Sequence, residues 1–100
     1  MQANPNLTSY SAVLEQKYGA VGTPQREEFT NRARTYYVGL MLQEARKEEH
    51  ITQVELARRT GTSKSYISRI ENGLIDPTIS SFMRILDALG LRFELTRTLA

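Results

Sequence analysis

One hundred residues suffice for one domain, and a hydrophobic content of 40% with 24% charged residues is ordinary for a globular protein. A formal net charge of +2 favours a local basic face over a basic coating of the whole surface. The absence of cysteine excludes disulfides, thiol catalysis and cysteine-based zinc sites. No apolar run has membrane-spanning length and no signal-peptide pattern opens the chain, so we expect a cytoplasmic protein without a membrane partner.

Residues 1–24 are predicted to form an N-terminal extension with one short helix. Thr8 or Ser9 can cap that helix, and Gly19 is expected to end it just after Tyr18. Residues 1–6 are expected to be unstructured.

A helix-turn-helix domain is predicted over residues 25–100, beginning with a long helix from about Gln25 to Glu49. Apolar residues recur in this helix at helical spacing, which predicts a buried stripe. The stripe comprises Phe29, Ala33, Tyr36, Tyr37, Leu40, Met41 and Ala45.

The segment 52–73 predicts a short helix, a glycine-containing turn and a second short helix. Thr52 and Glu55 form a capping-box pattern at the start of the first helix. Ala57 supplies a small side chain where two helix backbones must approach, and Gly61 supplies the positive φ that such a turn often needs. The spacing as a whole is typical of a DNA-binding helix-turn-helix.

Charge separates this interpretation from a plain helical hairpin without a nucleic-acid role. From Arg58 through Ile70 the sequence has four basic residues and no acidic residue, whereas a solvated hairpin normally mixes the two signs. Leu56, Ile67 and Ile70 are expected on the shared inner faces. The second helix can be capped by Thr62 or Ser63 and ended by Gly73.

A further helix is predicted after the loop at residues 74–77, with Thr78 as its cap and Gly90 as its end. Its expected buried face comprises Ile79, Phe82, Met83, Ile85, Leu86 and Leu89. No ligand set for a metal, no paired-carboxylate pattern and only a lone histidine, His50, are present, so we expect neither an enzyme nor a cofactor.

Residues 91–97 alternate strictly and predict a short C-terminal β-strand, with Leu91, Phe93 and Leu95 on one face. A lone strand needs a partner for its backbone groups. It can pack on its own N-terminal segment, pair with the same strand of a second copy, or pair with a strand of another protein. We favour an intermolecular partner, because the sequence shows no second strand.

With these residues laid out, the chain resembles the phage-repressor and Cro-like helix-turn-helix family, also called the xenobiotic-response-element (XRE) type. The resemblance covers roughly residues 36–90, and Thr60 departs from it where the family often has an apolar residue. It implies an all-α, lambda-repressor-like DNA-binding domain of about five helices. The matching residues are Thr52-Gln53, Glu55-Leu56-Ala57, Gly61, Ser63, Ile67, Ser68-Arg69-Ile70-Glu71-Asn72-Gly73, Pro77 and Ala88-Leu89-Gly90.

This resemblance also implies which residues touch double-stranded operator DNA. Gln53 is placed at a phosphate, and Asn72 makes a second backbone contact. Lys64, Ser65 and Arg69 are placed at base edges. The same outward face also includes Ser63, Ser68 at its edge, and Tyr66, which contacts a thymine methyl, a phosphate or the neighbouring helix. Two copies in a homodimer would read a palindrome.

Over its full length the chain resembles antitoxins of the HigA type. The resemblance rests on Tyr18-Gly19, on residues 22–29 and on residues 90–95. It implies a type II toxin-antitoxin pair, in which the antitoxin represses its own operon and blocks a small RelE- or HigB-type ribonuclease that cleaves mRNA. The alternatives are a stand-alone regulator of the same family and an interaction module that no longer binds DNA.

Overall fold

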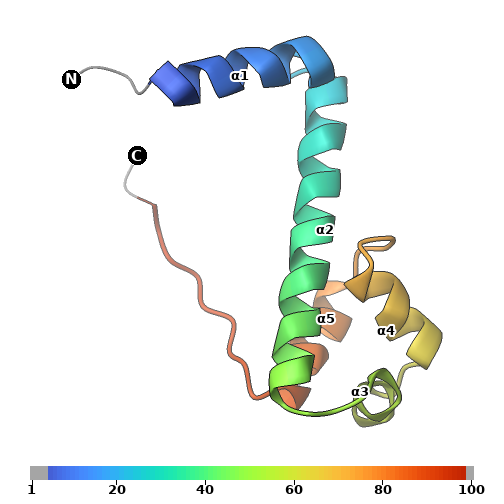
Figure 1. Ribbon diagram of the computed structural model, residues 1–100. Coiled ribbons are helices and arrows are strands. Elements are labelled where there is room, and N and C mark those ends of the chain that lie inside the picture. Colours follow the sequence, from blue (N-terminus) through green and yellow to red (C-terminus); the bar gives the residue numbers. More distant parts are fainter. Residues whose placement is uncertain (1–4, 99–100) are drawn as a thin grey trace. The chain divides into compact units, whose positions relative to one another are not determined.

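The computed structural model describes the backbone of residues 5–98 and the side chains of residues 12–98. These residues contain five α-helices, drawn in Figure 1: α1 (Pro5–Tyr18), α2 (Pro24–Glu48), α3 (Gln53–Thr60), α4 (Lys64–Glu71) and α5 (Ile79–Ala88). The expectation of an all-α fold of about five helices is therefore confirmed for this part of the chain. None of the helices is long and apolar enough to cross a membrane, as judged over the same residues.

The chain divides into two compact units, residues 1–34 and residues 35–100, and α2 contributes residues to both. The domain division at residue 24 stays a prediction. In the first unit, the rings of Tyr18 and Phe29 stack with centroids 3.9 Å apart and an interplanar angle of 15°. This contact links α1 to the start of α2.

The first helix begins earlier than predicted. Its first residue is Pro5, not a residue after a cap at Thr8 or Ser9, and proline is well suited to the first turn because its missing N–H would have no partner there. The expected end after Tyr18 is confirmed, with Gly19 at φ 91°. The prediction that residues 1–6 are unstructured is wrong for Pro5 and Asn6, which belong to α1, and residues 1–4 lie outside the described residues.

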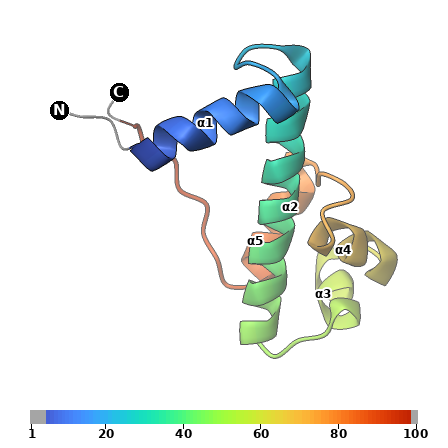
Figure 2. The same cartoon turned by 45° about the horizontal axis from the view of Figure 1, so that its top comes forward.

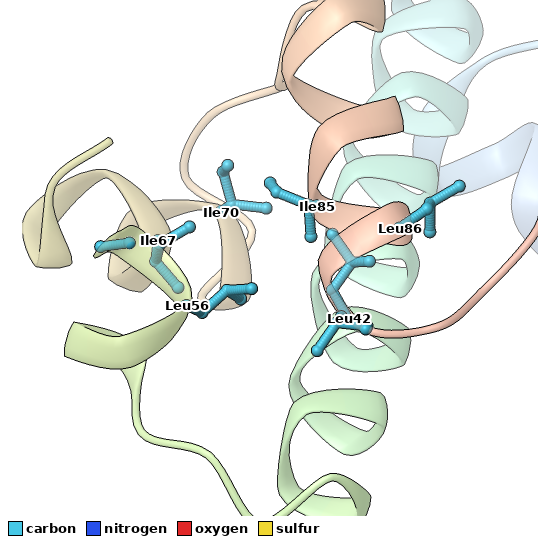
Figure 3. Close-up of a cluster of buried hydrophobic side chains, with 8 residues drawn as sticks. Leu42, Leu56, Ile67, Ile70, Ile85 and Leu86 are labelled. Atoms are coloured by element: carbon cyan, nitrogen blue, oxygen red, sulfur yellow. The ribbon is translucent and has the colours of Figure 1, made fainter. Parts of the chain in front are cut away.

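The core of the second unit is built from all four of its helices. Figures 1 and 2 show α5 beside the carboxy-terminal half of α2, and Figure 3 shows the labelled side chains converging between these helices, α3 and α4. The predicted burial of Leu56, Ile67 and Ile70 is confirmed. The core cluster comprises Leu42, Leu56, Ala57, Ile67, Ile70, Ile85, Leu86 and Leu89.

The predicted apolar stripes of α2 and α5 are wrong in part. Tyr36, Tyr37 and Met41 are exposed, and the buried face of α2 instead carries Gly39, Leu42 and Arg46. On α5, Ile79 is 82% exposed and Met83 is exposed as well. Each helix has more apolar residues than its packed face can cover, so periodicity alone does not select which of them are buried.

The predicted C-terminal strand is not formed. Residues 91–98 have no regular secondary structure and make no ladder, and every one of them is exposed. Alternation is a property of the sequence, whereas a strand needs the backbone of a second segment, which residues 5–98 do not supply. Phe93 packs only edge-on against Phe82 of α5, with ring centroids 6.2 Å apart.

Candidate DNA-binding site

The turn between α3 and α4 is held by local hydrogen bonds at each helix end. The Thr52 hydroxyl accepts from the Glu55 N–H at 3.0 Å, and the Ser63 hydroxyl accepts from the Tyr66 N–H at 3.1 Å, so both predicted caps are confirmed. Gly61 lies between the helices at φ 67°, a left-handed conformation that costs glycine little. These caps fix where the second helix begins.

Helix α4 has one buried face and one outward face. Ile67, Ile70 and Glu71 are buried against the rest of the unit. We call the remaining residues and the two caps the α4 face. It consists of exposed Ser63, Lys64, Ser65, Arg69 and Asn72 and of half-buried Tyr66 and Ser68. Seven of the eight residues predicted to bind DNA therefore lie on one short helix and its caps, although their contact with DNA stays a prediction.

Hydrogen bonds within the α4 face hold two of its side chains. Arg69 donates from Nη2 to the Ser65 hydroxyl at 3.0 Å, one helical turn away. Asn72 donates from Nδ2 to the Ser68 carbonyl at 2.8 Å and to the Ser68 hydroxyl at 3.3 Å. A long arginine side chain loses conformational freedom when it binds a ligand, so a side chain already held in place loses less.

Basic residues on α3 are engaged differently from those on α4. Glu55 accepts from Arg58 at 2.6 Å and from Arg59 at 2.9 Å, instead of closing the capping box on Thr52. The hydrogen bond from Arg58, followed by that from Arg59, lowers the pKa of the Glu55 carboxyl to about 2 and raises the pKa of Arg58. Their charge is thus partly balanced on α3, and Lys64 and Arg69 supply the cationic character of the α4 face.

Sequence reasoning missed a buried ion pair that fixes α4 against α2. Arg46 donates from Nε to Glu71 at 2.7 Å and from Nη2 to the same carboxylate at 3.0 Å, while its Nη1 donates to the Ile51 carbonyl at 2.9 Å. The hydrogen bond to Glu71 raises the pKa of Arg46 further. The sequence carried only part of the signal: Arg46 falls one turn after Leu42, but the burial of that face of α2 became clear only from the structure.

Gln53 belongs to this buried network. Its side chain is half-buried, and its Nε2 donates to Glu71 at 3.0 Å. This hydrogen bond connects the start of α3 to the end of α4. The phosphate contact predicted for Gln53 stays a prediction. The departure at Thr60 has a local explanation, since its buried hydroxyl donates to the Leu56 carbonyl at 2.9 Å.

The fold and the α4 face together define a helix-turn-helix protein. A family model described as helix-turn-helix matches residues 42–95, more than half of the chain, and the chain belongs to this family. Its relatives support the narrower Cro and XRE type: an ImmF control region 10 kDa protein of Bacillus phage phi105 is 37% identical over 54 residues, or 54% of this chain and 60% of that protein. The immunity repressor protein of the same phage is 36% identical over 55 residues, or 55% of this chain and 38% of that protein.

A solved structure supports the fold independently. The restriction-modification controller protein C.AhdI from Aeromonas hydrophila superposes with a TM-score of 0.60 over 62% of this chain and 90% of that chain, at 24% identity. The chain spans 60% and 38% of the lengths of the two phage proteins it matches. The residues before Leu42 lie outside the family match.

Proposed function

We propose that this protein is a sequence-specific DNA-binding repressor of its own operon, in which α4 lies in the major groove. The observation that carries the proposal is the α4 face itself: Lys64 and Arg69 project outward from a helix whose opposite side is anchored in the core. Family membership and relatives named as repressors support it. The proposal includes no catalytic step, cofactor or metal; the described residues contain no cluster of three metal-ligating side chains.

Reading and positioning fall to different residues. Arg69 is suited to two hydrogen bonds with guanine O6 and N7, and Lys64 to one. The Ser65 hydroxyl holds Arg69 in place, so we assign Ser65 a positioning role beside its weaker ability to read a base. Asn72, Gln53 and the N-terminus of α3 are suited to phosphates, which fix register without reading sequence.

Replacing Arg69 tests whether this residue reads a base. Arg69→Ala should weaken binding to the upstream DNA of the protein's own gene by about 1–3 kcal/mol and relax base preference at one position per half-site. The measurement is a titration against the native duplex and a set of single-base variants. Arg32→Ala removes an exposed arginine of the first unit, outside both α4 and the C-terminal segment, and should leave both affinity and preference unchanged. An equal loss on every duplex would assign Arg69 to the phosphates instead.

One α4 face covers only a few base pairs, so we propose that the protein binds DNA as a homodimer. Two copies related by a two-fold axis would place the reading helices about one turn of DNA, roughly 34 Å, apart. The proposed dimer or partner segment contains Leu91, Phe93 and Leu95, which the structure leaves exposed. Their role does not require a preformed strand, because pairing with a partner can order an extended segment.

We further propose that the regulator is an antitoxin of the HigA type that neutralises a RelE- or HigB-type mRNA-cleaving toxin. The resemblance at residues 18–19, 22–29 and 90–95 supports this, and its first two parts lie outside the residues matched by the family. The second candidate is a stand-alone XRE-type regulator, which the names of the phage relatives favour.

Co-expression with the neighbouring reading frame distinguishes the two candidates. An antitoxin should co-purify with a small neighbouring protein and rescue growth when that protein is toxic alone. A stand-alone regulator would bind the promoter but neither co-purify with the neighbour nor change its effect on growth. Arg69→Ala serves as a control, because it should weaken DNA binding and leave the rescue intact.

A further inference from the structure

The second unit contains a groove whose lining includes no residue of the α4 face. It has a volume of about 260 Å³ and is bordered by α2 and α5. Apolar side chains of both helices line it, and two acidic side chains of α2 lie among them. The residues that matter here are Met41, Ala45, Phe82 and Leu86, with the exposed carboxylates Glu44 and Glu48.

The C-terminal segment, residues 91–98, begins at this groove and leaves it. Leu91 lines the groove, and Phe93 packs edge-on against Phe82. Beyond that point the segment has no regular secondary structure, and Leu95 is 87% exposed. Alternate residues of a paired strand share a face, so Leu95 and Arg97 would project on one side once a partner orders this segment. The chain therefore carries an acid-flanked apolar groove whose lining includes Leu91 but neither Leu95 nor Arg97 of the same segment.

We propose that the groove receives the C-terminal segment of a second copy, with Leu95 among the apolar side chains and Arg97 beside Glu44 and Glu48. Charge complementarity supports this occupant, since Arg97 would meet two carboxylates. Self-complementarity favours a second copy over another protein, because one two-fold axis satisfies both grooves and both segments. The two segments would pass each other in opposite directions, where their unpaired backbone groups could bond to each other.

This inference deepens the homodimer of the proposed function by assigning the surface that forms it. It makes the dimer independent of DNA, because the α4 face takes no part in it. It also explains how a segment that forms no strand within one copy can still be a dimerisation element. The contact would bury Leu95 and the exposed side of Met41.

Exchanged charges test the proposal by sedimentation velocity without DNA. We expect the unmodified protein to sediment as a dimer. Glu48→Arg and Arg97→Glu should each weaken the dimer by about tenfold, because an attraction becomes a repulsion twice per dimer. An equimolar mixture of the two variants should restore dimers, since each groove then meets a segment of opposite charge. Val21→Glu, a charge placed on an exposed residue of the first unit, should change nothing.

Three results would overturn the proposal: a monomeric unmodified protein, single variants that dimerise normally, or a mixture that stays monomeric. If the double variant Glu48→Arg/Arg97→Glu recovers folding stability while the mixture recovers nothing, the segment contacts its own groove. Circular dichroism of each variant separates loss of the dimer from loss of the fold. A negative result for the groove would not affect the Arg69→Ala experiment, so the proposed dimer contact and the proposed DNA binding by α4 can be rejected independently.

Discussion

Arg46 is a charged side chain in a core position of α2, and three hydrogen bonds satisfy its guanidinium. Arg46→Met would leave the buried Glu71 carboxylate with Gln53 but without its counter-ion. We expect the free energy of unfolding to fall by about 3–5 kcal/mol in urea titrations. Lys47→Met, on the exposed neighbour, should change it by less than about 0.5 kcal/mol.

The double variant Arg46→Met/Glu71→Leu distinguishes two contributions to the free energy of unfolding: the loss caused by an unpaired buried charge and the net stabilisation by the ion pair. Replacing both partners with apolar residues removes the unpaired charge, so much of the lost stability should return. If the two single losses simply add, Arg46 and Glu71 act independently and the ion pair does not join α2 to α4.

His50 adopts a left-handed backbone conformation at φ 58°, which glycine accepts more readily. It lies where α2 ends: the Ile51 N–H donates to the Arg46 carbonyl at 3.4 Å and the His50 N–H to the Lys47 carbonyl at 3.0 Å. His50→Gly should raise the free energy of unfolding by about 0.5–1 kcal/mol, measured by thermal or urea unfolding.

The reverse substitution provides the control for His50→Gly. Gly61 has a similar φ of 67°, and a Cβ added there would meet open space, so Gly61→Ala tests backbone strain without a clash. It should lose stability where His50→Gly gains it. A neutral or destabilising His50→Gly would indicate that the imidazole makes a contribution larger than the backbone strain.

At the scale of elements, α2 and α4 approach so closely at Gly39 that no larger residue fits. A Cβ there would clash with the Ile70 carbonyl oxygen and lie 2.9 Å from that of Glu71. Gly39→Ala should therefore cost about 1–3 kcal/mol, despite the roughly 1 kcal/mol that alanine gains in helix propensity. Lys47→Ala, at an exposed position of the same helix outside the groove, is the matched control. A stabilised Gly39→Ala would show that the helices can separate at little cost.

The helices could be predicted well where their signals are local. Thr52, Ser63 and Thr78 each cap the helix expected of them, and the long helix predicted over residues 25–49 spans Pro24–Glu48. The strand over residues 91–97 could not be judged in the same way, because pairing depends on a second segment. The burial of Arg46 is likewise set by the partner that α4 brings to it.

At the scale of the whole molecule, the sequence predicted the helix-turn-helix unit better than the parts outside it. The spacing from Thr52 to Gly73 constrains two helices and a turn at once, and the family match at residues 42–95 includes it. The first unit has no such constraint: α1 begins before its predicted start, and the role of this unit rests on a resemblance. The groove between α2 and α5 could not be predicted from the sequence, because Met41 and Phe82, which line it, are far apart in the chain.

The most direct test of the central claim is an amide chemical-shift titration of the labelled protein with a duplex from upstream of its own gene, at low ionic strength. We predict saturable shifts concentrated at residues 63–72 of the α4 face and at the start of α3, and no comparable response to a shuffled duplex at the same concentration. Shifts that avoid Lys64 and Arg69, or an unchanged spectrum, would contradict the assignment of α4 as the DNA-reading helix.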